Sequence, residues 1–278
     1  MTARVSAPRA IVYRTRGTTH GPITRLMSPS DLGQVLKPFI FLDLVNFQAG
    51  GLNQGFGMHP HSGIATVTFL SQGDVRYEDT TGQSGLLPAG GVEWMRAGNG
   101  VWHSGSPVGE APGLGFQLWV ALPADLENAA AQSQYLAPEL VPRIGPVRVL
   151  LGDYGQARSP VAAPAGMTYL SVSLAKGERW TYTPPMGHTV AWVAVAAGRL
   201  EAAESIEAGE LVAFADSSAS IELLATEATS LVLGSAVPHP HDLVMGHYSV
   251  HTSRQALDQG EAEIRRIRQQ LREAGRLG

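Results

Sequence analysis

The sequence contains no cysteine, and this absence excludes several kinds of chemistry at once. Thiol nucleophiles, disulfide bonds, and zinc or iron–sulfur centres held by cysteine cannot form in this chain. Any metal ion must therefore be held by His, Asp or Glu side chains.

Long apolar runs and an excess of positive charge are also missing. No stretch approaches the roughly 18 apolar residues of a membrane span, and the first ten residues, M-T-A-R-V-S-A-P-R-A, lack the apolar core of a signal peptide. We therefore expect a cytoplasmic protein that does not bind a membrane. With 20 Lys and Arg against 24 Asp and Glu, the formal net charge of −4 argues against direct nucleic-acid binding.

What the chain does contain is typical of an all-β protein. Its 278 residues are 44% hydrophobic, and 32 glycines and 18 prolines separate short apolar runs. Residues 1–37 are mixed and predict a few edge strands, whereas 123–145 predict a short helix or a loop crossing. The remaining runs of the first half predict strands at 38–45, 64–70, 75–79, 92–95, 101–104 and 115–122.

The second half repeats the pattern of the first half faintly. Residues 186–200 can be laid beside 58–75, and residues 206–214 beside 87–95, with an apolar run and a glycine turn in each pair. We therefore predict two β-barrels, an N-terminal domain over 1–135 and a C-terminal domain over 136–278. The second copy keeps one histidine, His188, so we expect no metal site in it.

The C-terminal segment differs in period from the rest. Apolar residues at helical spacing among charges predict a helix laid across a barrel: Leu257, Ile264, Ile267 and Leu271. Thr252 or Ser253 is the expected N-cap and Gly275 the expected stop. We expect four arginines of this segment to lie on the solvent-exposed face of the helix: Arg265, Arg266, Arg268 and Arg272.

A group of histidines is the chemical signal in the first half. His59 and His61 lie one residue apart in G-F-G-M-H-P-H-S-G, so on a strand both side chains point to one face. His103 follows on a later strand, which an antiparallel barrel brings back beside the first. Three neutral imidazoles suit Fe(II), Mn, Co, Ni, Cu or Zn better than Mg or Ca. Two ordinary loop histidines remain the alternative for the pair.

An ordered set of motifs resembles the pirin family of bicupin proteins. The motifs are P-F-I-F-L-D (38–43), G-F-G-M-H-P-H-S-G (55–63), G-D-V-R-Y-E-D-T-T-G-Q-S-G (73–85), G-V-E-W-M-R-A-G-N-G-V-W-H-S (91–104), G-F-Q-L-W-V (115–120) and, more weakly, D-L-V-M-G-H-Y-S-V-H-T (242–252). The resemblance implies an all-β fold of two cupin barrels, a bicupin, ending in a helix. It also implies iron in the N-terminal cupin, held by His59, His61 and His103.

One ligand that the resemblance implies is missing from this chain. The family carries a glutamate two residues after the third histidine, where this sequence has Gly105, and the general cupin position after the histidine pair holds Ala65 and Thr66. Without this carboxylate a metal would be more Lewis acidic and more weakly held, or the site is a relic. Glu93 and Glu110 are candidate substitutes, although nothing in the sequence aims either at the metal.

The resemblance implies two functions, and the composition leaves a third. The first is a metal-dependent dioxygenase of the quercetin 2,3-dioxygenase type, acting on flavonol-like aromatic substrates. The second is a non-catalytic regulatory module with a weakened or empty metal site that docks to a protein partner. The third is a metal-free cupin that binds a small metabolite. The three retained histidines favour the first, and Gly105 favours the second.

Other polar and aromatic residues are weaker candidates for a functional site. The second H-x-H, P-H-P-H-D at 238–242 with His247 and His251 nearby, is an alternative metal site, but its prolines favour a turn. Gln117 and Trp119 alternate on a strand and are candidates for lining a pocket. Asp79 lies on a half-polar strand, so we expect it to be exposed.

Overall fold

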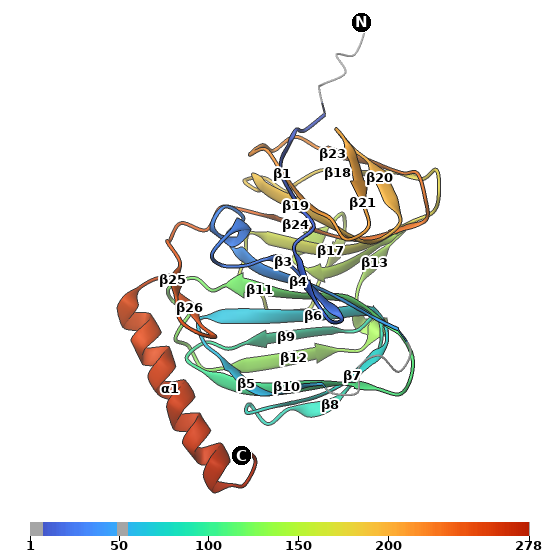
Figure 1. Cartoon of the computed structure of the whole chain (residues 1–278). Helices are drawn as coiled ribbons and strands as arrows, with labels where there is room; N and C mark the ends of the chain where they lie inside the picture. The colour runs from blue at the N-terminus through green and yellow to red at the C-terminus, as the bar shows by residue number, and fades with distance from the viewer. Residues whose placement is uncertain (1–7, 49–54, 278) are drawn as a thin grey trace, which may run out of the picture.

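The computed structural model describes residues 8–48 and 55–277, and its strands form two barrels stacked one above the other (Figure 1). In each barrel a seven-stranded sheet faces a four-stranded sheet, and the central strand pairs are antiparallel. The all-β, two-barrel architecture with a C-terminal helix confirms the predicted fold class.

The first barrel is formed mostly by the N-terminal half. Its larger sheet runs in the order β12 (Gln132–Leu136), β9 (Val92–Arg96), β6 (Ile64–Gln72), β11 (Gly113–Ala121), β4 (Phe39–Phe47), β3 (Ile23–Met27) and β2 (Thr18–His20). Its smaller sheet runs β5 (Phe56–His61), β10 (Val101–Val108), β7 (Asp74–Asp79) and β8 (Ser84–Leu87).

The second barrel has the same plan. Its larger sheet runs β1 (Ile11–Thr15), β22 (Leu211–Phe214), β19 (Val190–Ala197), β24 (Thr229–Ala236), β17 (Met167–Leu174), β14 (Val147–Leu151) and β13 (Arg143–Ile144). Its smaller sheet runs β18 (Arg179–Tyr182), β23 (Ile221–Ala225), β20 (Arg199–Glu201) and β21 (Ser205–Glu207). The remaining elements are the hairpins β15 (Asp153–Tyr154) with β16 (Ala157–Arg158) and β25 (Val244–Met245) with β26 (Val250–His251), two 3-10 turns (Leu32–Gln34 and Pro138–Leu140), and the helix α1 (Arg254–Glu273).

The strand order reproduces the repeat seen in the sequence. β6 lies between β9 and β11 in the first barrel, and β19 lies between β22 and β24 in the second. The sequence comparison lays β19 beside β6 and β22 beside β9, and the strand order adds the pair β24 and β11. The two barrels are therefore built from equivalent units.

The faces that the two larger sheets turn toward each other form the main core. Phe39 on β4 meets Trp192 on β19 edge to face, with ring centroids 5.5 Å apart, and both side chains are fully buried. Gly234 on β24 makes room for the indole, because a Cβ there would lie 2.4 Å from the Trp192 ring. Each such buried aromatic contributes on the order of 1.5–3 kcal/mol, so the barrels are held as one packed body.

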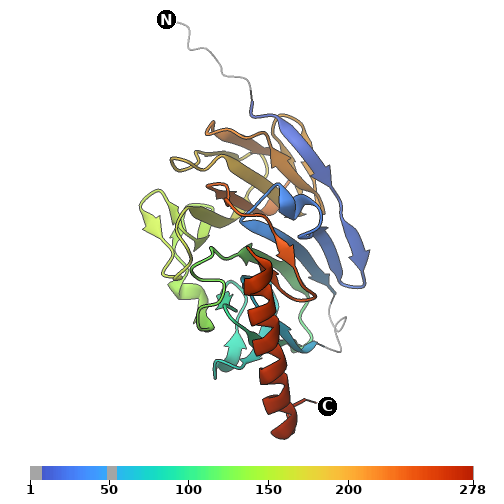
Figure 2. The ribbon, with the colours of Figure 1, turned by 90° about the vertical axis from the view of Figure 1, so that its left-hand side faces the viewer.

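Two segments cross between the halves of the chain. β1 pairs with β22 and so closes the edge of the second barrel, although it lies near the N-terminus. α1 follows the second barrel in sequence but packs against β10 of the first, and Figure 2 shows the helix running in front of the lower part of the molecule. The division into two domains between residues 135 and 136 stays a prediction. β1 and α1 each pack on the barrel formed mostly by the other side of that boundary.

The helix follows the sequence prediction closely. The Ser253 hydroxyl accepts from the Ala256 N–H at 3.2 Å as the N-cap, and Gly275 follows the end with φ +68°. The four predicted apolar residues are buried, and the four arginines are exposed. The Trp102 indole N–H donates to the carbonyl of Ile264 at 3.0 Å and fixes the helix on β10.

One element differs from its prediction. Residues 132–136 form β12, an edge strand paired with β9, where the sequence predicted a helix or a loop. Q-S-Q-Y-L is half exposed and pairs on one side only, so it lacks the apolar alternation of the inner strands. Within the described ranges, no helix has both the length and the apolar character needed to cross a bilayer.

Candidate metal centre

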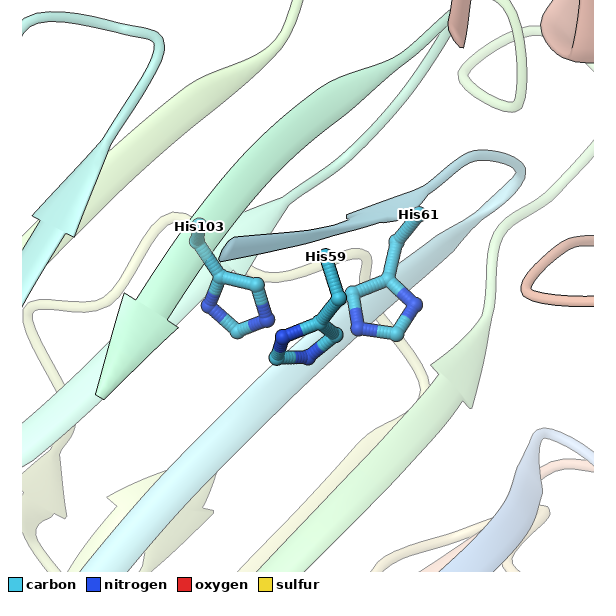
Figure 3. Close-up of side chains that lie close together, drawn as sticks. All are labelled: His59, His61 and His103. Atoms are coloured by element: carbon cyan, nitrogen blue, oxygen red, sulfur yellow. The ribbon is translucent and has the colours of Figure 1, made fainter. Parts of the chain in front are cut away.

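Two neighbouring strands of the smaller first-barrel sheet bring the three predicted histidines together. β5 carries His59 and His61 on the same face, and β10 pairs with β5 so that His103 lies directly opposite His59. Figure 3 shows the rings of His103 and His61 on either side of His59. The antiparallel return expected from the sequence therefore accounts for the cluster.

The imidazoles are close enough to share one ion. The candidate ligand atoms of His59, His61 and His103 all lie within 4.8 Å of one another, and the ring centroids are 4.4–5.1 Å apart. At a metal–nitrogen distance of about 2.0–2.1 Å, two ligands on one ion lie at most about 4.2 Å apart. Small ring rotations therefore suffice for coordination.

Hydrogen bonds assign the tautomers of two of these rings. The Nδ1 of His59 lies 2.7 Å from the carbonyl of Gly57, and the Nδ1 of His61 lies 3.1 Å from the carbonyl of Tyr248. A carbonyl oxygen only accepts, so each Nδ1 carries the proton and each Nε2 keeps its lone pair. Tyr248 lies between β25 and β26, so a hairpin from the second half of the chain orients the His61 ring of the first barrel.

Burial favours the neutral form of the His59 and His61 rings, which is the form that can bind a metal. Burial first, and the neighbouring His103 second, lower the pKa of His59 to about 4 and hold the pKa of His61 well below its ordinary value of 6.5. The Nε2 atoms of His61 and His103 are buried and have no hydrogen-bond partner among the described residues. Orphaned buried nitrogens are costly, and a transition metal fits them because it accepts neutral imidazole nitrogen.

A buried carboxylate lies behind the third histidine. Glu93 on β9 is 7% exposed, and its Oε1 lies 3.7 Å from the Nδ1 of His103. The hydroxyl of Thr68 donates to its other oxygen, Oε2. From the sequence alone, Glu93 was one of two candidate substitute carboxylates, with nothing to favour it over the other. The pairing of β6 with β9 favours Glu93, because it places Thr68 and Glu93 opposite each other as register partners.

The other positions considered for a carboxylate do not supply one. Gly105 lines the same cavity as His59 and His103 but has no side chain. Ala65 faces the core between the barrels, and Thr66 is fully buried with its hydroxyl unpartnered among the described residues. Glu110 is exposed in the turn between β10 and β11.

The histidines separate an inner cavity from an outer cleft. The inner cavity, about 70 Å³, lies in the barrel and is lined by His59, His103, Glu93 and Gln117 among others. The outer cleft, about 380 Å³, is also lined by His59 and Gln117. Small-molecule sites usually measure about 300–1,000 Å³, so of these two spaces the outer cleft has the room for a ligand of drug size.

Aromatic rings form one wall of the outer cleft. Phe41 and Trp119 stack with centroids 4.1 Å apart and planes within 8°, and the Arg25 guanidinium lies 4.0 Å from the Phe41 ring centroid. Arg25 also donates two hydrogen bonds to Asp43 at 2.6 and 3.1 Å. Gln117 and Trp119 thus line a pocket, as the alternation predicted.

The remaining histidines do not gather into a second group of three ligands within the described residues. His188 is buried and its Nδ1 lies 2.9 Å from the Ser235 hydroxyl. His239 and His241 lie in a turn, with the backbone N–H of His241 donating to His239. His251 is buried between the Ser62 hydroxyl at 3.0 Å and the Glu127 carboxylate at 3.2 Å.

The expectation for Asp79 was wrong. Its side chain is 2% exposed and accepts hydrogen bonds from the backbone N–H and the hydroxyl of Thr81 and from the hydroxyl of Tyr135. Asp79 ends β7 and closes a tight turn, so it is satisfied by local backbone donors. The half-polar pattern of β7 did not reveal this, because the turn bonds form after the strand.

Comparisons with known proteins agree with this fold. A family model described as "Pirin" matches residues 22–120. A Pseudomonas aeruginosa protein named "Putative quercetin 2,3-dioxygenase" is 31% identical over 253 residues, covering 86% of this chain and 88% of that protein. Human pirin is 34% identical over 159 residues, covering 55% of this chain and 54% of its own length.

Solved structures extend the likeness to the whole chain. Quercetin 2,3-dioxygenase from Acinetobacter baumannii matches with a TM-score of 0.84 at 26% identity, covering 94% of this chain and 98% of that chain. The Escherichia coli pirin YhhW, solved in complex with nickel(II), matches with a TM-score of 0.64 at 20% identity, over 83% of this chain and 98% of its own. This second likeness concerns the fold alone.

Proposed function

Because this chain belongs to the pirin family, we propose that it binds a divalent transition metal through His59, His61 and His103. We further propose that it acts as a quercetin 2,3-dioxygenase-type oxidoreductase on flavonol-like aromatic substrates. The observation that carries the proposal is the convergence of three imidazoles, two of them with orphaned Nε2 atoms, at the inner end of an aromatic-walled cleft. The names of the Pseudomonas and Acinetobacter relatives support the activity.

The metal is Fe(II) in the first instance, with Ni, Mn, Co, Cu or Zn as the other candidates. When bound, it supplies a Lewis-acidic centre that favours the anion of an acidic hydroxyl. The nickel(II) complex of Escherichia coli YhhW supports keeping nickel among the candidate metals.

The residues of this chain orient the substrate and exclude water. A flat ring system fits beside the stacked Phe41 and Trp119, where its face meets apolar surface. The amide of Gln117, which lines both the cleft and the cavity, is placed to bind a hydroxyl or carbonyl on the ring edge. The inner cavity, about 70 Å³, is too small for the substrate and leaves room only for small molecules beside the histidines.

A second candidate function rests on Gly105. With no carboxylate at this position, three neutral ligands hold a doubly charged ion, which lowers affinity and favours a regulatory module that binds a protein partner. The third candidate is a metal-free cupin that binds a small metabolite in the cleft.

Two measurements separate these functions. The first is elemental analysis of tag-free protein expressed with iron available, and the second is dioxygen uptake with quercetin. Wild-type protein is compared with His59→Ala and with His188→Gln, which alters a buried histidine outside the cluster. Stoichiometric metal with turnover that requires His59 but not His188 supports the dioxygenase. Metal without turnover supports the regulator, and absence of both supports the metal-free cupin.

A further inference from the structure

Glu93 is an acidic side chain placed inside a barrel, away from solvent. It is 7% exposed and sits on β9, a strand that carries none of the three histidines. Within the described residues its one ion-pair partner is His103. A buried carboxylate is costly unless it is paired and hydrogen-bonded, so its position calls for a reason beyond packing.

The neighbours of Glu93 fix its direction. The Thr68 hydroxyl donates to Oε2, which leaves Oε1 facing the Nδ1 of His103 at 3.7 Å. The Nε2 of the same ring is the orphaned atom that belongs to the histidine cluster. Glu93 therefore lies behind His103, on the side opposite the shared point of the three rings.

The three histidines differ in what holds their Nδ1 atoms. His59 and His61 use neutral backbone carbonyls at 2.7 and 3.1 Å, whereas His103 faces a carboxylate. A carboxylate behind a ligating imidazole fixes the Nδ1–H tautomer and makes the Nε2 lone pair a stronger donor. In a barrel interior of low dielectric, its negative charge also acts across the ring.

We propose that Glu93 is the positioning residue of the metal centre: it holds the Nδ1 proton of His103 and supplies the negative charge that the ligand set lacks at Gly105. This inference rests on the proposed metal-binding function. Glu93 itself is not a ligand, because the atoms that lie within 4.8 Å of one another belong to the three histidines. Closing the 3.7 Å separation to a hydrogen bond requires a shift of about 0.5–1 Å.

The test compares metal binding by the full-length chain and by Glu93→Gln. Calorimetric titration with Co(II) should give a dissociation constant about 10–100-fold weaker for the variant, while the melting temperature of the metal-free protein stays unchanged, because the amide oxygen still accepts from Thr68. Glu127→Gln is the matched control, since Glu127 is a 3%-exposed carboxylate beside another buried histidine. It should leave the dissociation constant unchanged.

A second variant asks whether charge is what matters. Gly105 has an ordinary φ and an added Cβ would meet only Val75 at 3.5 Å, so a side chain fits there. Gly105→Glu added to Glu93→Gln should restore most of the lost affinity, because it returns one negative charge to the same cavity. An unchanged Glu93→Gln affinity overturns the inference, and so does a weakened affinity that Gly105→Glu fails to restore.

Nitrogen NMR of wild-type protein gives a readout that needs no variant. In the metal-free state His103 should be the Nδ1–H tautomer, and an Nε2–H tautomer overturns the inference even if Glu93→Gln does not fold. If wild-type protein binds no metal, the proposed function fails with it. If wild-type binds and Glu93→Gln binds equally well, only the inference fails. The ligand-field spectrum of bound Co(II) is then compared between wild type and Glu93→Gln. If the variant's spectrum shows the loss of an oxygen donor, Glu93 is a ligand and the positioning assignment is wrong.

Discussion

Replacing His61 by leucine separates the cost of the empty site from the stability that a metal adds. In the metal-free protein the Nε2 of His61 is buried without a partner in the described chain, which costs about 1–3 kcal/mol. His61→Leu removes this atom but also removes the hydrogen bond to the carbonyl of Tyr248, worth about 0.5–1.5 kcal/mol. The two effects oppose each other. The free energy of unfolding of the metal-free variant should therefore lie within about 1–2 kcal/mol of the wild-type value.

The metal-loaded comparison gives the larger effect. A ligand at 100 times its dissociation constant stabilises the native state by about 2.7 kcal/mol, which for a chain of this size is a rise of roughly 5–10 °C in melting temperature. His61→Leu should abolish that rise because two imidazoles remain. His188→Leu, which replaces a buried histidine outside the cluster, should retain the metal-induced rise in melting temperature.

Scanning calorimetry with and without Co(II) measures both quantities. A metal-induced rise retained in His61→Leu would refute the three-histidine centre. A loss above about 4 kcal/mol in the metal-free variant would refute the argument that the orphaned nitrogen is itself destabilising, because it would mean that His61 is mainly a packing residue.

Three further predictions concern the surroundings of the site. Ile264→Ala, in the helix face packed on the first barrel, should lower the free energy of unfolding by about 2–4 kcal/mol in urea titrations. The pKa of His59 is lowered to about 4 in the folded protein from an ordinary 6.5. The unfolded state therefore binds more protons between these values, and metal-free stability should fall as pH falls from 6.5 toward 4, as urea midpoints at pH 7 and 5 would show. Gly63→Ala should cost at least about 2 kcal/mol, because φ is +73° and its Cβ would lie 2.0 Å from a backbone oxygen.

Each of these predictions has a control and an outcome that contradicts it. Arg265→Ala, on the exposed side of the same helix, should change stability by less than about 0.5 kcal/mol; an equal loss in both helix variants would mean that the burial of Ile264 does not explain its effect, because alanine has the higher helix propensity in both cases. His59→Gln should reduce the slope of stability against pH without abolishing it, because the pKa of His61 is lowered as well; a slope that persists unchanged would contradict a contribution from His59. Gly57→Ala, with open space around its Cβ, should be tolerated where Gly63→Ala is not.

The sequence predicted the repeating parts of the fold and the ligand positions, because both depend on period. Alternation on a strand places His59 and His61 on one face whatever the rest of the chain does. The helix face and its Ser253 cap follow in the same way from local pattern. These features are determined by residues that are close together in the sequence.

The features that the sequence did not predict are those set by pairing between distant segments. Nothing local shows that β1 joins the second barrel through β22, or that Tyr248 orients His61 across the two halves. Glu93 became distinctive only once the register of β6 and β9 placed Thr68 beside it. Such contacts depend on strand order, and strand order is a property of the whole chain.

The contrast between the two barrels identifies what turns this scaffold into a site. On β6 the interior positions include Thr66 and Thr68, since their neighbours face the core between the barrels. On β19 the equivalent interior positions are Val193 and Val195, which join an apolar core that fills the second barrel. An apolar interior gains free energy from burial, whereas the first barrel holds unpaired imidazole nitrogens and a carboxylate at a cost. The packed second barrel and the core between the sheets offset that cost, which lets the first barrel keep the polar interior that the proposed metal centre requires.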